Sequence, residues 1–201
     1  GHLDMVRIFD RIMRRAGIPI AYSQGFHPHP KLSFGHPLPL GLTSTAEYAD
    51  ITLSEPFPEF EKTLRKNLPD GLGLVRIAVI PDRASSLTQI VTVSDYFVRC
   101  PVDDETEARL RDILGRDSIP VIRSTKRGNK EVDLRRGIEE LIVAVDRSGF
   151  IMRLSVETGT AVKPYEALGL VFPGNYNVNV ERTEQYAMHN NTRVSPFDVM
   201  W

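Results

Sequence analysis

Apolar and polar positions alternate with recognisable periods along residues 1–80. Between Leu3 and Ala16, the apolar side chains fall within one arc when successive residues are turned by about 100°, which predicts an amphipathic helix that Gly17 is well placed to end. Tyr48–Leu53 alternates apolar and polar side chains, as is typical of a half-buried strand. The elements predicted here are a helix over 3–16, loops with short strands at 18–23 and 32–34, a strand over 48–53, a helix over 57–68 and a strand over 72–80.

A similar pattern returns after a polar, turn-rich linker at 81–92. Asp104, with Glu107 three residues later, resembles a capping box and predicts the start of a helix. The predicted elements are a strand over 94–100, this helix, strands over 119–123, 141–146 and 150–156, a helix over 164–169 and a strand over 177–182. Allowing for one added strand, the sequence predicts an α+β protein of two tandem ferredoxin-like (βαββαβ) halves, residues 1–80 and 93–201. The first half is missing its leading strand, which is expected to lie before Gly1.

The composition is that of a globular protein. Hydrophobic residues make up 41% and charged residues 25% of the chain, so a sizeable core is available. The longest apolar runs, such as Leu141–Val145, are far shorter than the roughly 20 residues that span a bilayer, and no membrane segment is predicted. Cys100 is the only cysteine, which excludes an internal disulfide framework and favours a reducing, cytoplasmic location. The formal net charge is −1, so any nucleic-acid surface must be a local basic patch.

Arginines crowd into one narrow arc of the first predicted helix. They are Arg7, Arg11, Arg14 and Arg15, with Asp4 among them and Asp10 at the edge. Like charges four residues apart destabilise a helix by roughly 0.2–0.5 kcal/mol per pair. The pattern therefore fits either a solvated face with partial pairing to the carboxylates, or a face that binds an anion or a phosphate.

The loop that follows this helix holds the richest set of chemical groups in the chain. Hydroxyl, amide, imidazole and amine groups occur together on Tyr22, Ser23, Gln24, His27, His29 and Lys31. Two histidines without a nearby thiolate or carboxylate make a poor metal site, so no metal is predicted. The loop fits either a rigid connector stiffened by Pro28 and Pro30 or a surface for RNA or phosphate. Because the loop starts near the end of the helix, we expect one exposed positive surface made of Arg11, Arg14, Arg15, His29 and Lys31.

A second, weaker basic segment lies in the other half. Residues 123–130 form a hairpin-like tip with Lys126 and Arg127, which fits either a solvated loop or a contact with a phosphate backbone. The sequence contains no phosphate-binding P-loop, nucleotide-binding glycine pattern, nucleophile elbow or three-cysteine cluster for an iron–sulfur centre. No cofactor is therefore predicted.

Several runs of the sequence resemble the radical SAM-linked protein family, a bacterial domain of unknown function found beside or fused to the C-terminus of radical SAM proteins. The resemblance is carried by residues 1–7, 14–19, 37–41, 46–48, 130–135 and 181–186, and above all by the loop run 21–34. His29 fits the family pattern, whereas His27 stands where the family often has asparagine. The resemblance implies a radical SAM protein as partner, which would supply the radical cluster and its cysteines.

Two functions remain open from the sequence. The first is an accessory module without catalysis of its own that binds RNA, a ribosomal component or a phosphate-rich substrate for the radical SAM partner. The second is a metal-independent RNA-processing enzyme that resembles the CRISPR repeat endoribonucleases and uses a histidine as acid or base. The predicted binding residues are the four helix arginines, the six loop residues Tyr22, Ser23, Gln24, His27, His29 and Lys31, and Lys126, Arg127 and Arg182.

Overall fold

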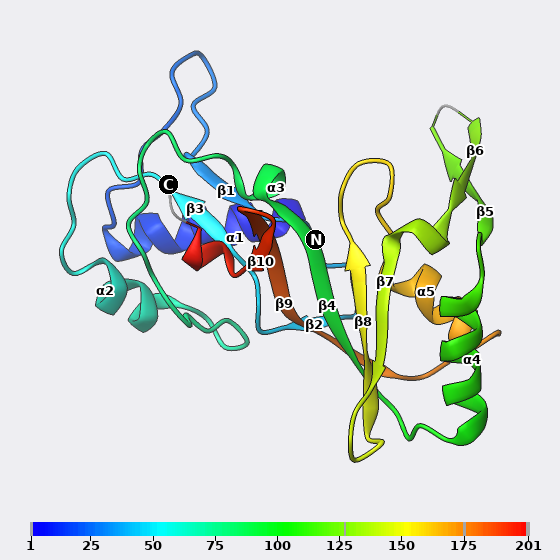
Figure 1. Ribbon diagram of the computed structural model, residues 1–201. Helices are drawn as coiled ribbons and strands as arrows, with labels where there is room; N and C mark the ends of the chain where they lie inside the picture. Colours follow the sequence, from blue (N-terminus) through cyan, green and yellow to red (C-terminus); the bar gives the residue numbers. More distant parts are fainter. Residues whose placement is uncertain (1, 127, 175, 200–201) are drawn as a thin grey trace. The chain divides into compact units, whose positions relative to one another are not determined.

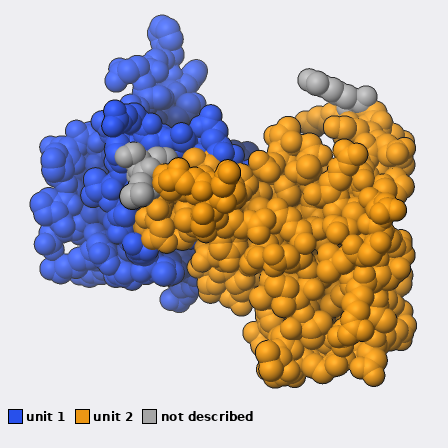
Figure 2. Space-filling view, viewed as in Figure 1, with its two compact units in different colours: residues 1–37, 48–89, 200–201 blue, residues 38–47, 90–199 orange. Residues whose placement is uncertain are grey.

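The division of the chain into two units does not follow its order in the sequence. The computed structural model describes residues 2–126, 128–174 and 176–199 (Figure 1). Unit 1 contains the residues up to Pro37 and Tyr48–Gln89, and unit 2 contains Leu38–Glu47 and Ile90–Val199 (Figure 2). The change at Gln89 lies inside the predicted linker. The segment Leu38–Glu47, here called the strap, belongs to unit 2 although both its flanks belong to unit 1, and the sequence did not predict this.

Unit 1 is built on two helices. The amphipathic helix predicted at 3–16 is confirmed as α1, His2–Ala16, and it packs with α2, Phe60–Asn67. Gly17 ends α1 with a φ of 66°, a conformation that glycine adopts readily. The core of the unit consists of Ile12, Met13, Ile18, Ile20 and Leu64. A two-stranded antiparallel sheet of β1, Leu32–Phe34, and β3, Ala49–Ile51, completes the unit.

The predicted strand at 72–80 is wrong. None of these residues pairs with a strand in the described chain, and Val75 and Val79 are 79% and 99% exposed. An alternating apolar pattern forms a strand only where a neighbour supplies the ladder hydrogen bonds and a face to cover. Residues 18–23 likewise form only two isolated bridges, Ile20 to Leu53 and Tyr22 to Pro30. The described part of unit 1 therefore does not confirm a ferredoxin-like first half.

Unit 2 is organised around one antiparallel sheet. The strand order is β10-β9-β4-β8-β7, and β2 of the strap pairs in parallel with β9. The bounds are β2 Thr43–Ser44, β4 Val91–Arg99, β7 Ile138–Val143, β8 Gly149–Ser155, β9 Asn179–His189 and β10 Thr192–Val194. The long strand β4 lies between β8 and β9, and six of its nine residues are buried.

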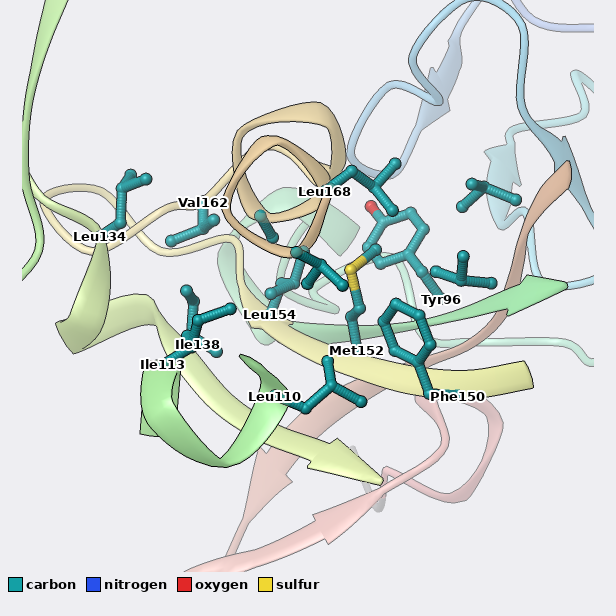
Figure 3. Packing of buried hydrophobic residues seen from close by; sticks show 14 of the residues in the cluster. Tyr96, Leu110, Ile113, Leu134, Ile138, Phe150, Met152, Leu154, Val162 and Leu168 are labelled. Atoms are coloured by element: carbon teal, nitrogen blue, oxygen red, sulfur yellow. The ribbon is translucent and has the colours of Figure 1, made fainter. Parts of the chain in front are cut away.

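Two helices cover one face of this sheet and form the main core. They are α4, Asp104–Gly115, and α5, Pro164–Val171, and their side chains pack on Tyr96, Phe150 and Met152 of the strands (Figure 3). The helix α4 begins at Asp104, as predicted, and its N-cap is Asp103, which accepts a hydrogen bond from Thr106 N at 2.8 Å.

A separate hairpin replaces the single strand predicted at 119–123. It consists of β5, Pro120–Thr125, and β6, Gly128–Asp133, and a short 3₁₀ helix, Leu134–Gly137, leads from it into β7. The remaining short elements are the helix α3, Leu87–Ile90, and a 3₁₀ turn at Pro196–Asp198. Among the described residues, no helix is both long enough and apolar enough to cross a bilayer.

Candidate nucleic-acid interface

A hydrogen-bonded group fixes the base of the predicted loop to α1. The Tyr22 hydroxyl donates to Asp10 Oδ1 at 2.7 Å, and Arg14 Nε donates to the same carboxylate oxygen at 3.2 Å and to the Tyr22 oxygen at 3.1 Å. The guanidinium of Arg14 also lies over the Tyr22 ring, 5.5 Å from its centroid. Burial raises the pKa of the Tyr22 phenol, and the hydrogen bond to Asp10 raises it further, so the phenol keeps the proton that it donates.

The loop itself is closed by hydrogen bonds of its backbone and of the Ser23 side chain. Ser23 N donates to His29 O at 2.8 Å, and His29 N donates to Ser23 Oγ at 2.9 Å. Lys31 N donates to Ala21 O at 2.8 Å, which completes the closure. We call residues 22–31 the His-Pro loop; it projects beyond β1 (Figure 1). Its ends are therefore held firmly while its outer residues stay accessible.

The outer residues of the His-Pro loop are exposed. Gln24, His27, His29 and Lys31 are all in this class, as predicted residues of the site. Phe26 is 101% exposed at the same tip, and the sequence analysis missed it because an apolar residue is ordinarily assigned to a core. Phe26 lies between Gly25 and His27, outside any helical or strand period, and this position in the sequence could have indicated that its ring is exposed. The loop thus presents an aromatic ring among polar and basic groups.

The helix arginines do not all act alike. Arg14 contacts the His-Pro loop, whereas Arg15 Nη2 donates to Asn67 O at 2.7 Å, at the C-terminal end of α2. Arg7 lies 3.8 Å from Asp4 in an exposed pair, and such pairs contribute little. Arg11 is exposed and has no ion pair within 4.0 Å in the described part of the chain. Arg14 therefore connects α1 to the loop. Among the described residues, one donor of the Arg15 guanidinium is taken up by the Asn67 carbonyl at the end of α2, and its other donors remain for a ligand.

Arg182 is a correction to the predicted binding set. Its side chain is 1% exposed, pairs with Glu47 Oε1 at 2.9 Å and donates to the Tyr96 hydroxyl at 3.1 Å. A guanidinium buried in this way is not available to a phosphate. Sequence reasoning missed its role because its partner lies 135 residues away, in the strap.

The basic tip of the β5–β6 hairpin belongs to unit 2. Lys126 is exposed there, and Arg127 lies outside the described residues. The hairpin is anchored through Arg123, whose Nε donates to Glu166 Oε1 at 2.7 Å and whose Nη2 donates to Ala161 O at 2.7 Å. Arg123 therefore serves the structure of the hairpin rather than its surface.

The Arg123–Glu166 pair predicts a pH-dependent contribution to stability. Burial alone raises the pKa of the Glu166 carboxyl, but hydrogen bonds from Arg123 and from Lys163 N outweigh it and hold this pKa below its ordinary value of 4.5. A lowered folded-state pKa stabilises above pH 4.5, and the contribution is lost as pH falls through the folded-state pKa. We expect Arg123→Met to lower the free energy of unfolding by about 2 kcal/mol at pH 7, and by less at a pH low enough to protonate Glu166 in the folded protein, measured by urea unfolding. An equal loss at both pH values would contradict this assignment.

The described residues do not include a cluster of side chains suited to bind a metal ion. In the ranges that the structure describes, no three side chains of His, Cys, Asp or Glu lie close enough together to hold a metal ion. His27 and His29 are both exposed on the His-Pro loop. The prediction that the chain binds no metal or cofactor stays a prediction.

The geometry defines a two-unit α+β protein that presents an anchored, basic and aromatic loop. A family model described as an uncharacterised protein conserved in bacteria, DUF2344, matches residues 1–164, and the chain belongs to this family. No curated protein matches the chain, and no solved structure matches it. The match includes α1, the His-Pro loop and the strap, together with most of unit 2.

Proposed function

We propose that this chain is a cytoplasmic accessory module that binds RNA, or another phosphate-rich substrate, for a radical SAM partner and has no catalytic activity of its own. The observation that carries the proposal is the His-Pro loop, which holds exposed Phe26, His29 and Lys31 on a base fixed to Arg14. The single cysteine supports the division of labour, because a radical cluster needs three thiolates that the partner would supply. The strand order β9-β4-β8-β7 supports a ferredoxin-like plan for unit 2.

The chemistry of the loop favours an RNA with unpaired bases. Proteins bind single strands by pairing cationic side chains with phosphates and by stacking bases on aromatic rings. Lys31 and the exposed arginines of α1 supply the cations, and Phe26 supplies an uncovered ring. Because the loop is closed by its own hydrogen bonds, little conformational entropy is lost when it binds.

The same loop gives weaker support to catalysis. A histidine that acts as acid or base is ordinarily oriented by a second group, often a carboxylate. Among the described residues, neither His27 nor His29 has a ring hydrogen bond to such a group. Binding is therefore the function that these side chains support best.

A salt titration of RNA binding tests the proposal. We expect the affinity of the full chain for a single-stranded RNA to fall steeply with salt, because each phosphate contact releases counterions. Replacement of Arg11, Arg14 and Arg15 together by serine should make the negative slope of log K against log salt shallower. The change should be up to about 2, at about 0.7 for each phosphate contact that is lost. Phe26→Ala should weaken binding by roughly tenfold with little change in the slope, since stacking on a ring is worth about 1–3 kcal/mol per base.

A matched control removes the same charge elsewhere. Arg111, Arg116 and Arg136 are exposed, and in the described part of the chain each forms an ion pair with a carboxylate three or four residues away, so their joint replacement by serine should leave the slope unchanged. Salt-independent binding, or no binding with and without the partner, would overturn the proposal. Cleavage of the RNA in the absence of metal, abolished by His29→Ala, would establish an enzyme instead.

A further inference from the structure

A pocket of about 270 Å³ lies within unit 2, and none of its lining residues belongs to the His-Pro loop. It is lined by Phe97 and Arg99 of β4, by Asn179, Val180 and Glu181 of β9, and by Gly41 and Thr43 of the strap. In the β4–β9 register, Glu181 lies opposite Phe97 and Asn179 lies opposite Arg99. Directly opposite residues share one face of a sheet, so these side chains project together.

The pocket combines the flat ring of Phe97 with polar side chains that can bind a ligand. The Phe97 ring packs against Gly149, where an added Cβ would lie 2.6 Å from Cζ of the ring. The guanidinium of Arg99 lies 5.4 Å from the centroid of that ring. Within the described ranges, the side chains of Asn179 and Glu181 have no hydrogen bond or ion pair. The pocket therefore offers a ring, a guanidinium, an amide and a carboxylate to a ligand.

The size of the pocket suits a single base. Its volume is slightly below the roughly 300–1,000 Å³ of pockets for drug-sized ligands. Bases bind to proteins by stacking on aromatic rings or guanidinium planes and by hydrogen bonds along their edges. The contact of Arg99 with Phe97 is exposed, and a base that stacks on the ring can displace it.

We propose that this pocket binds a guanine base, in a mononucleotide or in an RNA. An ionised carboxylate such as Glu181 only accepts hydrogen bonds, and guanine alone among the RNA bases has two neighbouring donors, N1–H and N2–H, on one edge. The O6 and N7 acceptors of guanine lie on its adjoining edge and match the donors of Arg99. The pocket goes beyond the proposed function, because it would bind a mononucleotide even if the His-Pro loop bound no RNA.

Calorimetric titration of the full chain with GMP, AMP, CMP and UMP tests this inference. We expect GMP to bind at least about tenfold more tightly than AMP, since a good bidentate contact gives that discrimination. Glu181→Gln should remove the preference for GMP, because the amide offers one acceptor and one donor in place of two acceptors. The variant with Arg11, Arg14 and Arg15 replaced by serine should bind GMP as the wild type does, which separates this site from the loop.

Two further variants keep the test decisive. Glu131→Gln removes the same charge from exposed β6 and should not change GMP affinity. If Glu181→Gln does not fold, as judged by circular dichroism, Asn179→Ala replaces it, and we expect several-fold weaker GMP binding. Equal affinity for the four nucleotides, no heat with millimolar GMP, or a preference for GMP that survives Glu181→Gln would overturn the inference.

Discussion

Replacement of Gly137 by alanine is expected to lower the free energy of unfolding of unit 2 by about 3 kcal/mol, the upper part of the range for overpacking. A Cβ on Gly137 would overlap the carbonyl oxygen of Thr160 and lie 2.6 Å from Val162 Cγ2. The opposing segment cannot move aside at low cost. Val162 is buried and donates its N–H to Ser155 O at 3.0 Å, and the hydroxyls of Ser155 and Thr160 lie 2.8 Å apart.

The control for this change is another glycine in the same unit. Gly169 lies exposed in α5, and a Cβ there would meet no atom within 4 Å. Gly169→Ala should therefore stabilise by about 0.5–1 kcal/mol, because alanine favours a helix over glycine. Urea unfolding followed by circular dichroism measures both variants. Gly137→Ala with wild-type stability would show that the approach of residues 137 and 160 is looser than the structure indicates.

Glu47→Ala should destabilise unit 2 by about 3 kcal/mol, at the low end of the range for breaking a buried ion pair. The change removes the Glu47 carboxylate from the guanidinium of Arg182, which is 1% exposed, whereas the side chain of Glu47 is 39% exposed. Partial exposure of Glu47 places the expected loss at the low end. The same region holds Gln185, which is fully buried and donates through Nε2 to Ala46 O at 2.5 Å.

A double variant identifies the cause of this loss. If the loss of this buried ion pair is responsible, Arg182→Met in the Glu47→Ala background should recover part of the stability, since a buried ion pair can often be replaced by apolar side chains. Glu131→Ala, at an exposed position of β6, should remain within about 0.5 kcal/mol of the wild type. A Glu47→Ala protein as stable as this control would mean that the Arg182–Glu47 pair contributes nothing to the fold.

Local pattern was sufficient for the helices α1, α2, α4 and α5 and for the inner strands of unit 2. The apolar arc of α1 and the alternation in β4 and β8 are visible in short windows of sequence, because one covered face imposes a period. The same local reasoning failed at 72–80, where the apolar residues pair with no strand in the described ranges. The β5–β6 hairpin was predicted only in part, since its second strand is mostly polar and exposed.

Some features of the candidate site could likewise be predicted from the sequence, and others could not. The sequence by itself determined that residues 7–31 concentrate basic, aromatic and imidazole groups, and the structure places Gln24, His27, His29 and Lys31 at the surface. Only the tertiary structure decided that Tyr22, Asp10 and Arg14 bind one another and that Phe26 is uncovered. These features depend on side-chain direction and exposure, which a period in the sequence does not specify.

Only the tertiary structure determines the ion-pair partner of Arg182 and the pairing of the strap with β9. In sequence, Arg182 is one more cation in a strand, and Leu38–Glu47 is a short segment with one proline, Pro39, and one glycine, Gly41. The fold pairs β2 with β9 and sets Glu47 beside Arg182 across 135 residues. The sequence determines which groups the chain carries and which local elements they favour. The partners of a buried charge depend on contacts between distant segments, and no local pattern encodes them.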